Sequence, residues 1–325
     1  MKALVTGGTG FVGSHVARQL AERGDQVRVL HRPTSRTQAL EGIPYEPAHG
    51  DVTDREAVRR ACEGVDVVFH VAAVADYWRA DVKHMFEVNV EGTRHVLAAA
   101  QEADVQRVVF TSSAAALGFL DDRPSDEAVP FNLPKEKFPY GYSKKLAEEI
   151  ASGYAAQGLH VVTLNPVVIM GPGDLNVISG TFMLQLKRYG MLTPLTHGGV
   201  SVIDVRDVAR YHLLAAERGQ SGERYVLMTA NYTYHEWFRL IAEVIGVRPP
   251  LLTLPNWVLP PAAAAIDGLR ALGVRTPIDA NQVRLGAKFV YFNGEKAHRA
   301  FGPPQIDMRQ SLQDTYAWYK QAGLI

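Results

Sequence analysis

The first half of the chain alternates short apolar runs with longer stretches in which apolar residues recur every three or four positions. The short runs are rich in β-branched residues, which favour strands, and the longer stretches have the spacing of amphipathic helices. Because a helix separates successive strands, the alternation indicates right-handed βαβ units and a parallel sheet. The predicted strands are 2–6, 26–31, 65–70, 106–111 and 160–165, and the predicted helices are 11–23, 54–63, 82–102 and 140–157.

The second half of the chain is less regular. Proline, glycine and aromatic residues interrupt positions 165–200, after which the pattern predicts a strand and a helix over 201–218 and another strand over 223–228. From position 234 onward the pattern is mainly helical. We therefore expect a doubly wound α/β fold of the Rossmann type with a smaller, mainly helical cap. The large domain would comprise 1–165 plus about 199–230, and the cap 166–198 plus 231–325.

Composition narrows the class of protein. Hydrophobic residues make up 47% of the chain and charged residues 21%, which is typical of a folded globular protein. Lysine plus arginine and aspartate plus glutamate both number 34, so the chain has no net charge and we expect no nucleic-acid partner. The one cysteine, Cys62, has no disulfide partner within the chain, and we expect it to be inert.

Two apolar stretches bear on membranes and targeting. The run from Met1 to Thr6 is too short for the core of a signal peptide. The stretch 257–272 is too short for a membrane span and contains Asp267 and Arg270. We therefore expect a cytoplasmic protein without a membrane span.

Three glycines, Gly7, Gly10 and Gly13, follow the first predicted strand and open the first predicted helix. Glycine is needed where the backbone turns tightly and where a pyrophosphate must approach without a Cβ in the way. The free N–H groups and the dipole of the helix N-terminus also favour a phosphate there. This segment therefore predicts a dinucleotide-binding loop. Its candidate cofactor-binding residues are Gly7, Thr9, Gly10, Phe11, Val12 and Gly13.

The end of the second strand bears on which dinucleotide is bound. NAD-selective folds carry an acidic residue here that accepts hydrogen bonds from the adenosine ribose. This chain has His31 and Arg32 instead, with Arg36 close by. A guanidinium suits a 2′-phosphate, so we expect a preference for NADP(H). In the alternative interpretation Arg32 only stacks on the adenine, and NAD(H) is also used.

Asp51 and Val52 follow a third extended segment. The Asp51 carboxylate could accept a hydrogen bond from the adenine amino group. Equally, it could cap the helix that begins near Asp54. The sequence leaves both interpretations open.

Tyr140 and Lys144 lie four positions apart, so on a helix they share a face. A free phenol has a pKa of about 10, and a nearby ammonium favours its ionised form, which would let Tyr140 exchange protons at neutral pH. Ser113, at the end of the preceding strand, could hold the substrate oxygen near Tyr140, with Ser112 or Thr111 as alternatives. These residues predict general acid catalysis coupled to hydride transfer from a nicotinamide.

Together these motifs resemble the extended short-chain dehydrogenase/reductase family, which is the NAD-dependent epimerase/dehydratase family. The resemblance rests on the glycine loop 6–13, Asp51-Val52, the segments 70–73 and 89–93, Ser113, Tyr140 and Lys144. Within the family, the segment 165–172 is similar to one in dihydroflavonol and cinnamoyl-CoA reductases, and the overall pattern is similar to bacterial hopanoid-associated sugar epimerases. The resemblance implies further cofactor contacts from Val71, Ala72, Ala73, Thr111, Tyr140, Lys144, Pro166 and Val168.

The resemblance leaves the reaction open. Sugar-nucleotide epimerases of the family often carry an arginine that grips a diphosphate, at a place where this chain has 198–201. Arg188 and Arg224 could substitute for it. We therefore expect an NADPH-dependent carbonyl reductase, with an epimerase or dehydratase that keeps NAD bound as the alternative. A protein that senses the nucleotide without turnover is the third candidate, and the intact Ser-Tyr-Lys set disfavours it.

The predicted substrate-binding side is rich in aromatic and methionine side chains. We expect Tyr77, Trp78, Phe182 and Met183 to line an apolar pocket for a hydrophobic aldehyde or ketone, although such residues could also form the core of the cap. The histidines lack the spacing of metal ligands, so no metal is expected. Helices 82–102 and 140–157 could pack into a homodimer, as helices of family members often do.

Overall fold

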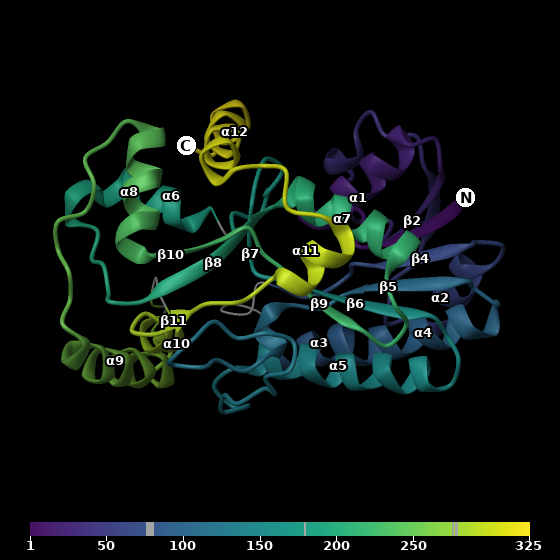
Figure 1. Ribbon diagram of the computed structural model, residues 1–325, viewed down its shortest axis with the longest axis horizontal. Coiled ribbons are helices and arrows are strands. Elements are labelled where there is room, and N and C mark those ends of the chain that lie inside the picture. Colours follow the sequence, from purple (N-terminus) through teal and green to yellow (C-terminus); the bar gives the residue numbers. More distant parts are fainter. Residues whose placement is uncertain (76–80, 179, 275, 277–278) are drawn as a thin grey trace.

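A computed structural model of the chain describes residues 1–75, 81–178, 180–274, 276 and 279–325. Its larger part is a parallel sheet of seven strands in the order β3-β2-β1-β4-β5-β6-β9 (Figure 1). The chain builds outward from β1 in one direction and then in the other, so the switch point lies between β1 and β4. The strands are β1 (Lys2–Thr6), β2 (Gln26–His31), β3 (Glu46–His49), β4 (Val67–His70), β5 (Arg107–Thr111), β6 (Val161–Pro166) and β9 (Arg224–Leu227).

Helices cover both faces of this sheet, because the strands carry apolar side chains on both faces and each face must be shielded from water. Figure 1 shows α1, α7 and α11 on one face and α2, α4 and α5 on the other, and each set closes a separate hydrophobic core. Cys62 is fully buried in the second core. The helices are α1 (Phe11–Glu22), α2 (Arg55–Cys62), α4 (Gly92–Glu102), α5 (Pro139–Ala156), α7 (Val205–Arg218) and α11 (Glu295–Phe301).

The doubly wound fold is confirmed, and the predicted strands and helices of the first half agree with the structure to within two residues at most ends. The predicted helix 82–102 is the exception, because it is not one regular helix. It is divided into α3 (Val82–Phe86), a π turn η2 (Glu87–Glu91) and α4. The π turn is important because it lies beside the cavity described below.

The smaller lobe contains a second sheet that the sequence pattern did not predict. Its central strand β8 (Gly199–Asp204) pairs with β7 (Val168–Met170), β10 (Ala230–Thr233) and β11 (Phe289–Val290). Several helices surround the sheet: α6 (Thr181–Tyr189), α8 (Tyr234–Ile245), α9 (Leu259–Ala271), α10 (Ala280–Leu285) and α12 (Met308–Gln321). Trp237 lies fully buried in the core that the sheet shares with α6, α8 and α12.

The two lobes are interleaved along the chain. The segment 199–230 was expected to return to the large domain, and α7 and β9 do so, but β8 pairs within the small sheet. Helix α11 lies within the predicted cap range 231–325, but it packs on the large sheet. The rest of the division into domains stays a prediction. The single-turn helices are η1 (Gln38–Leu40), η3 (Ala114–Ala116), η4 (Gly190–Leu192) and η5 (Asn256–Val258). Within the described residues, no helix is both long and apolar enough to cross a lipid bilayer.

Candidate active site

A cavity of about 680 Å³ lies at the carboxyl ends of β1, β4 and β5, between the large sheet and the small lobe. This is the switch point of the sheet, where doubly wound folds bind their ligands. Of the predicted cofactor and catalytic residues, Arg36 alone does not line the cavity. Those that do are Gly7, Thr9, Gly10, Phe11, Val12, Gly13, His31, Arg32, Asp51, Val52, Val71, Ala72, Ala73, Thr111, Ser113, Tyr140, Lys144, Pro166 and Val168.

The glycine loop has the geometry that a pyrophosphate requires. Gly7 has a φ of +70°, and a Cβ there would lie 2.7 Å from the backbone N of Ala72. A Cβ on Gly13 would lie 2.2 Å from the carbonyl oxygen of Gly7. Gly10 caps α1 without any side-chain hydrogen bond, which leaves the N–H groups of the first turn for a ligand. The loop therefore fits a dinucleotide.

A buried chain of hydrogen bonds, centred on His70, lies next to the glycine loop. The Thr6 hydroxyl accepts from the Ala72 N–H (3.2 Å) and meets His70 Nδ1 at 2.8 Å, while His70 Nε2 meets the Thr93 hydroxyl at 3.0 Å. Thr93 in turn donates to the Asn89 carbonyl, which fixes His70 as a neutral Nε2–H tautomer. Burial lowers the pKa of His70 to about 3, in agreement with that neutral form. His70 thus ties β1 and β4 to the loop beside the cavity.

The adenosine end of the cavity contains Arg32 and Asp51. Arg32 is 59% exposed, and its Nε lies 3.8 Å from Asp51 Oδ2. The other oxygen of Asp51 accepts hydrogen bonds from the backbone and hydroxyl of Thr53. Helix α2 is capped instead by Asp54, which accepts from the N–H groups of Glu56 and Ala57. The interpretation of Asp51 as a helix cap is therefore wrong.

The three residues of the predicted catalytic set come together on the other side of the cavity. Tyr140 lies in the first turn of α5, and Lys144 follows one turn later with Nζ donating to the Thr111 carbonyl at 2.9 Å. Ser113 ends the loop after β5, and its side chain hydrogen-bonds to Tyr140. The Ser112 hydroxyl donates a hydrogen bond to the Glu148 carboxylate, and the Thr111 hydroxyl forms a hydrogen bond with His212 Nε2. Among the three alternatives, only Ser113 reaches Tyr140.

Burial shifts the pKa values of Tyr140 and Lys144 in opposite directions. Burial raises the pKa of Tyr140, and the hydrogen bond with Ser113 acts in the other direction. Burial lowers the pKa of Lys144 to about 8, while the negative charge of Glu148 acts to raise it. At neutral pH the phenol therefore keeps its proton and the lysine keeps its charge.

Glu148 is a buried carboxylate that the sequence reasoning missed. It continues the face of α5 that carries Tyr140 and Lys144, at the same spacing of four, and this spacing was the available signal. Its Oε1 accepts from the Ser112 hydroxyl and from Asn165 Nδ2, and its Oε2 lies 3.1 Å from Arg224 Nη1. Arg224 is thereby held within the large lobe, and it does not line the cavity.

Asn89 in the π turn η2 belongs to the segment 89–93 that carries the family resemblance, but the sequence reasoning gave this residue no role. Its side chain accepts from the Val74 N–H at 2.8 Å and donates to the Val74 carbonyl at 3.2 Å. It also donates to the Ser143 hydroxyl, which donates to the Tyr140 carbonyl at 2.7 Å. Asn89 therefore fastens both the loop after β4 and the helix that carries Tyr140.

The side of the cavity toward the small lobe is mostly apolar, and its polar residues are Asp174, Asn176 and Ser201. Of the lysines and arginines that the structure describes, only Arg32 and Lys144 line the cavity. Phe182 packs edge-on against Phe238, and Met183 is buried in the core of the small lobe, so neither reaches the cavity. The candidates Tyr77 and Trp78 lie outside the described residues. The apolar lining on this side comprises Val74, Ala75, Val88, Phe119, Ile178, Val200, Leu285, Val290 and Phe292.

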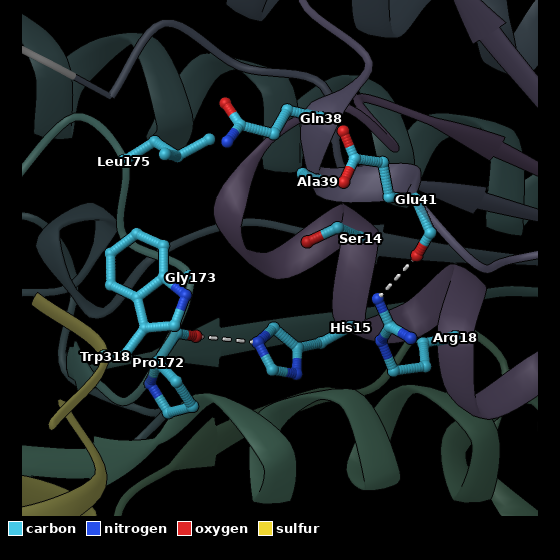
Figure 2. Close-up of a pocket in the computed structure, with 10 residues that line it drawn as sticks. All are labelled: Ser14, His15, Arg18, Gln38, Ala39, Glu41, Pro172, Gly173, Leu175 and Trp318. Carbon is cyan, nitrogen blue, oxygen red and sulfur yellow. Dashed lines mark hydrogen bonds between the residues drawn. The ribbon is translucent and has the colours of Figure 1, made fainter. Parts of the chain in front are cut away.

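A second, smaller cavity of about 350 Å³ lies behind the glycine loop (Figure 2). Figure 2 shows His15 and Arg18 of α1 on one side and Trp318 and Pro172 on the other, with His15 Nε2 directed at the Pro172 carbonyl (2.9 Å). Burial lowers the pKa of His15. Because none of the catalytic set lines it, this cavity is not the reaction site. In it, His15 joins α1 to the segment that follows β7.

Comparison with known proteins agrees with this geometry. Residues 3–227 match the model of the NAD dependent epimerase/dehydratase family. The chain is 36% identical to a putative dihydroflavonol 4-reductase of Synechocystis, over 99% of this chain and 95% of that protein. It is 32% identical to sterol demethylase protein B of Methylococcus capsulatus over the full length of both.

A solved structure gives the same result. The crystal structure of gox2253 superimposes with a TM-score of 0.87 at 35% identity, covering 99% of this chain and 98% of that one. The match therefore includes the small lobe as well as the parallel sheet. With the cofactor loop, the catalytic set and these relatives in agreement, the chain belongs to the NAD-dependent epimerase/dehydratase family of extended short-chain dehydrogenases/reductases.

Proposed function

We propose that this protein is an NADPH-dependent reductase of hydrophobic aldehydes or ketones. The observation that carries the proposal is the contact of Ser113 with Tyr140, one helical turn from the buried Lys144, in a cavity whose outer side is mostly apolar. The relatives support it, because one is named as a putative dihydroflavonol reductase and another as a sterol demethylase protein.

The chemistry assigns a distinct role to each residue. When bound, the nicotinamide supplies the hydride. Tyr140 donates its phenolic proton to the substrate oxygen, and Ser113 holds that oxygen by a hydrogen bond. Lys144 lies beneath them with its ammonium on the Thr111 carbonyl, so its positive charge favours the phenolate that remains on Tyr140. The lysine is also the group that would hold the nicotinamide ribose.

The preference for NADPH rests on Arg32. The end of β2 has no carboxylate, and the largely exposed guanidinium of Arg32 lies at the rim of the cavity. A 2′-phosphate would gain a charge-assisted hydrogen bond there. Asp51 lies close enough to position the guanidinium.

The apolar lining supports a hydrophobic substrate. A nucleotide sugar carries a diphosphate, which needs cations that the described lining offers only at Arg32 and Lys144. Neither Arg188 nor Arg224 lines the cavity, so neither substitutes in this arrangement. A carbonyl compound with an apolar body matches the lining better.

An epimerase or dehydratase with tightly bound NAD is the second candidate, because the matching family is named for these activities. The two candidates differ in how the cofactor behaves. Mass spectrometry of the supernatant from freshly purified, heat-denatured protein separates them. Little bound nucleotide, with tighter binding of added NADPH than of NADH, supports the reductase. Stoichiometric NAD that does not exchange would support the epimerase or dehydratase and contradict the reductase.

The mechanism is tested by replacing Tyr140 with phenylalanine. The Tyr140→Phe variant should lose about 100- to 10,000-fold in turnover of a hydrophobic carbonyl substrate, because the proton donor is gone, and should still bind NADPH. Tyr142→Phe is the matched control, since Tyr142 lies on the same helix but packs against Phe86 and Phe131 outside the cavity. Turnover that is unchanged in Tyr140→Phe would sink the mechanism.

A further inference from the structure

The outer edge of the small lobe exposes large apolar side chains. Leu192 is 79% exposed, Leu251 76%, Trp257 76% and Leu272 82%. Single exposed leucines are common on soluble proteins, but a group of this kind on one lobe is not. We call these four residues, together with Met191, Leu252 and Leu269, the apolar edge.

The segments that carry the apolar edge adjoin one another in space or along the chain. Two loops that are distant in sequence are joined by backbone hydrogen bonds from Leu251 to Met191 and from Leu195 to Leu252. Trp257 follows in η5, which leads directly into α9 and on to Leu272. Figure 1 shows the segment between α8 and α9, together with α9 itself, at the end of the molecule that is far from the N-terminus.

Helix α9 lacks the polar outer face of an ordinary surface helix. Its exposed positions are mostly proline, alanine and leucine, and they include Pro261, Ala264 and Leu269. Asp267, the one acidic residue of α9, is paired with Arg284 of α10. An amphipathic helix at a water-facing surface would carry charges here instead.

Positive charges border the apolar edge. Lys187 and Arg188 precede η4, and Arg248 lies three residues before Leu251. Lys187 lies over the ring of Tyr316 and Arg188 over that of Tyr189, and within the described part of the chain none of the three cations forms an ion pair. The segments 187–195 and 246–258 contain no acidic residue at all. The apolar edge is therefore flanked by uncompensated positive charge.

This edge connects with the wall of the cavity. Helix α10 packs against α9, and its Leu285 lines the cavity together with Val290 of β11. One layer of helix thus separates the apolar edge from the apolar side of the site.

We infer that the apolar edge docks on the surface of an anionic phospholipid bilayer. Leucine and tryptophan side chains enter the interface, and Lys187, Arg188 and Arg248 contact the headgroups, as in other interfacial proteins. This binding does not depend on the proposed reaction. Its consequence for substrate supply does: if the protein is a carbonyl reductase, its substrates are lipid-soluble compounds that partition into the membrane.

Sedimentation with lipid vesicles tests the inference. The full-length protein should pellet with vesicles of equal parts phosphatidylcholine and phosphatidylglycerol at least tenfold more than with pure phosphatidylcholine, and added salt should weaken the binding. A Leu251→Ser, Trp257→Ser, Leu272→Ser triple variant should lose at least tenfold in binding. A Lys187→Glu, Arg188→Glu, Arg248→Glu variant should lose the preference for phosphatidylglycerol. The matched control is Val82→Ser, which changes an exposed apolar residue of the other lobe.

Three results would overturn the inference. The first is no binding to either vesicle, and the second is binding that does not respond to the charge variant. The third is a dimer in light scattering that the serine variant dissociates, since a second copy would then cover the edge. NADPH titration of the same variants keeps this test separate from the proposed function, because docking can fail while cofactor binding and turnover of a soluble carbonyl remain.

Discussion

Lys144 is a fully buried ammonium whose charge depends on a single carboxylate. Burial lowers the pKa of this ammonium to about 8, which is close to neutral pH. Glu148 supports the charge from one turn away, and Arg224 pairs with the far oxygen of that carboxylate. The remaining neighbours of Glu148, Ser112 and Asn165, are neutral donors.

This arrangement predicts the pH dependence of reduction. The pKa of Lys144 is lowered to about 8, so its charge is present below that pH and is lost as the pH rises through it. Burial raises the pKa of Tyr140, so the phenol stays protonated over this range. The kcat/KM for carbonyl reduction should therefore fall above about pH 8. A profile that is flat from pH 7 to 10 would contradict this assignment.

Glu148→Gln should move that fall to lower pH. Removing the carboxylate leaves the ammonium of Lys144 less stabilised and leaves Arg224 without its partner. Glu149→Gln is the matched control, because Glu149 pairs with Lys145 on the exposed side of the same helix. A variant that loses activity equally at every pH would show that Glu148 only supports the fold.

Arg32 is the residue that should decide the choice of cofactor. Arg32→Ala should weaken NADPH binding by about 10- to 100-fold, which is the contribution of a charge-assisted hydrogen bond, and should leave NADH binding nearly unchanged. Arg36→Ala, outside the cavity, should have the smaller effect. The measurement is fluorescence titration with both nucleotides. An equal loss for both would mean that Arg32 only stacks on the adenine.

At the scale of elements, the π turn η2 is the connection between the loop after β4 and helix α5. Asn89→Ala leaves the backbone N–H and carbonyl of Val74 without their partner in a part-buried setting, and it removes one of the two hydrogen bonds of the Ser143 hydroxyl. The free energy of unfolding should fall by about 1–3 kcal/mol, measured by urea denaturation. Asn132 is the matched control, because it makes the same pair of bonds with Phe119 but is exposed. If Asn132→Ala lowered the free energy of unfolding by the same amount, the proposed role of the π turn as a connection would be contradicted.

The elements also show what a sequence can predict. Strands β1 and β2 have the predicted bounds residue for residue, because each is a short segment rich in valine and leucine that ends at a glycine or a charged residue. Strands β7 and β11 have three and two residues, which is too short for any periodicity. Their pairing with β8 joins segments that are distant in sequence, so no local pattern reports it. The π turn is equally hidden, since one extra residue barely changes the helical period.

The candidate site divides in the same way. The glycine loop and the pair Tyr140–Lys144 are local patterns, and the cavity gathers all of them. Glu148 shares the spacing of four with Tyr140 and Lys144, but the partners of Asn89 and Glu148 lie in other elements, which no local spacing identifies. Met183 was expected at the substrate, but a methionine that faces a pocket and one that fills a core have the same sequence pattern.

At the scale of the whole molecule, the cavity is shared by the two lobes. Strand β6 of the large sheet ends at Pro166, β7 of the small sheet begins at Val168, and both residues line the cavity. NADPH at 100 times its Kd should therefore stabilise both lobes together, by about 2.7 kcal/mol, as one shifted transition in scanning calorimetry. Two transitions of which only one moves would mean that the cofactor contacts the large lobe alone.

The burial of Cys62 has a practical consequence. Its thiol lies in the core between α2, α4 and the sheet, and burial raises its pKa to about 12. Maleimides and mild oxidants react with thiolates, so the native protein should not react with them. Any cysteine introduced at the surface would then be the single reactive thiol. A fluorophore placed at Leu272 in this way could report, on an otherwise unaltered chain, whether that position leaves water when vesicles are added.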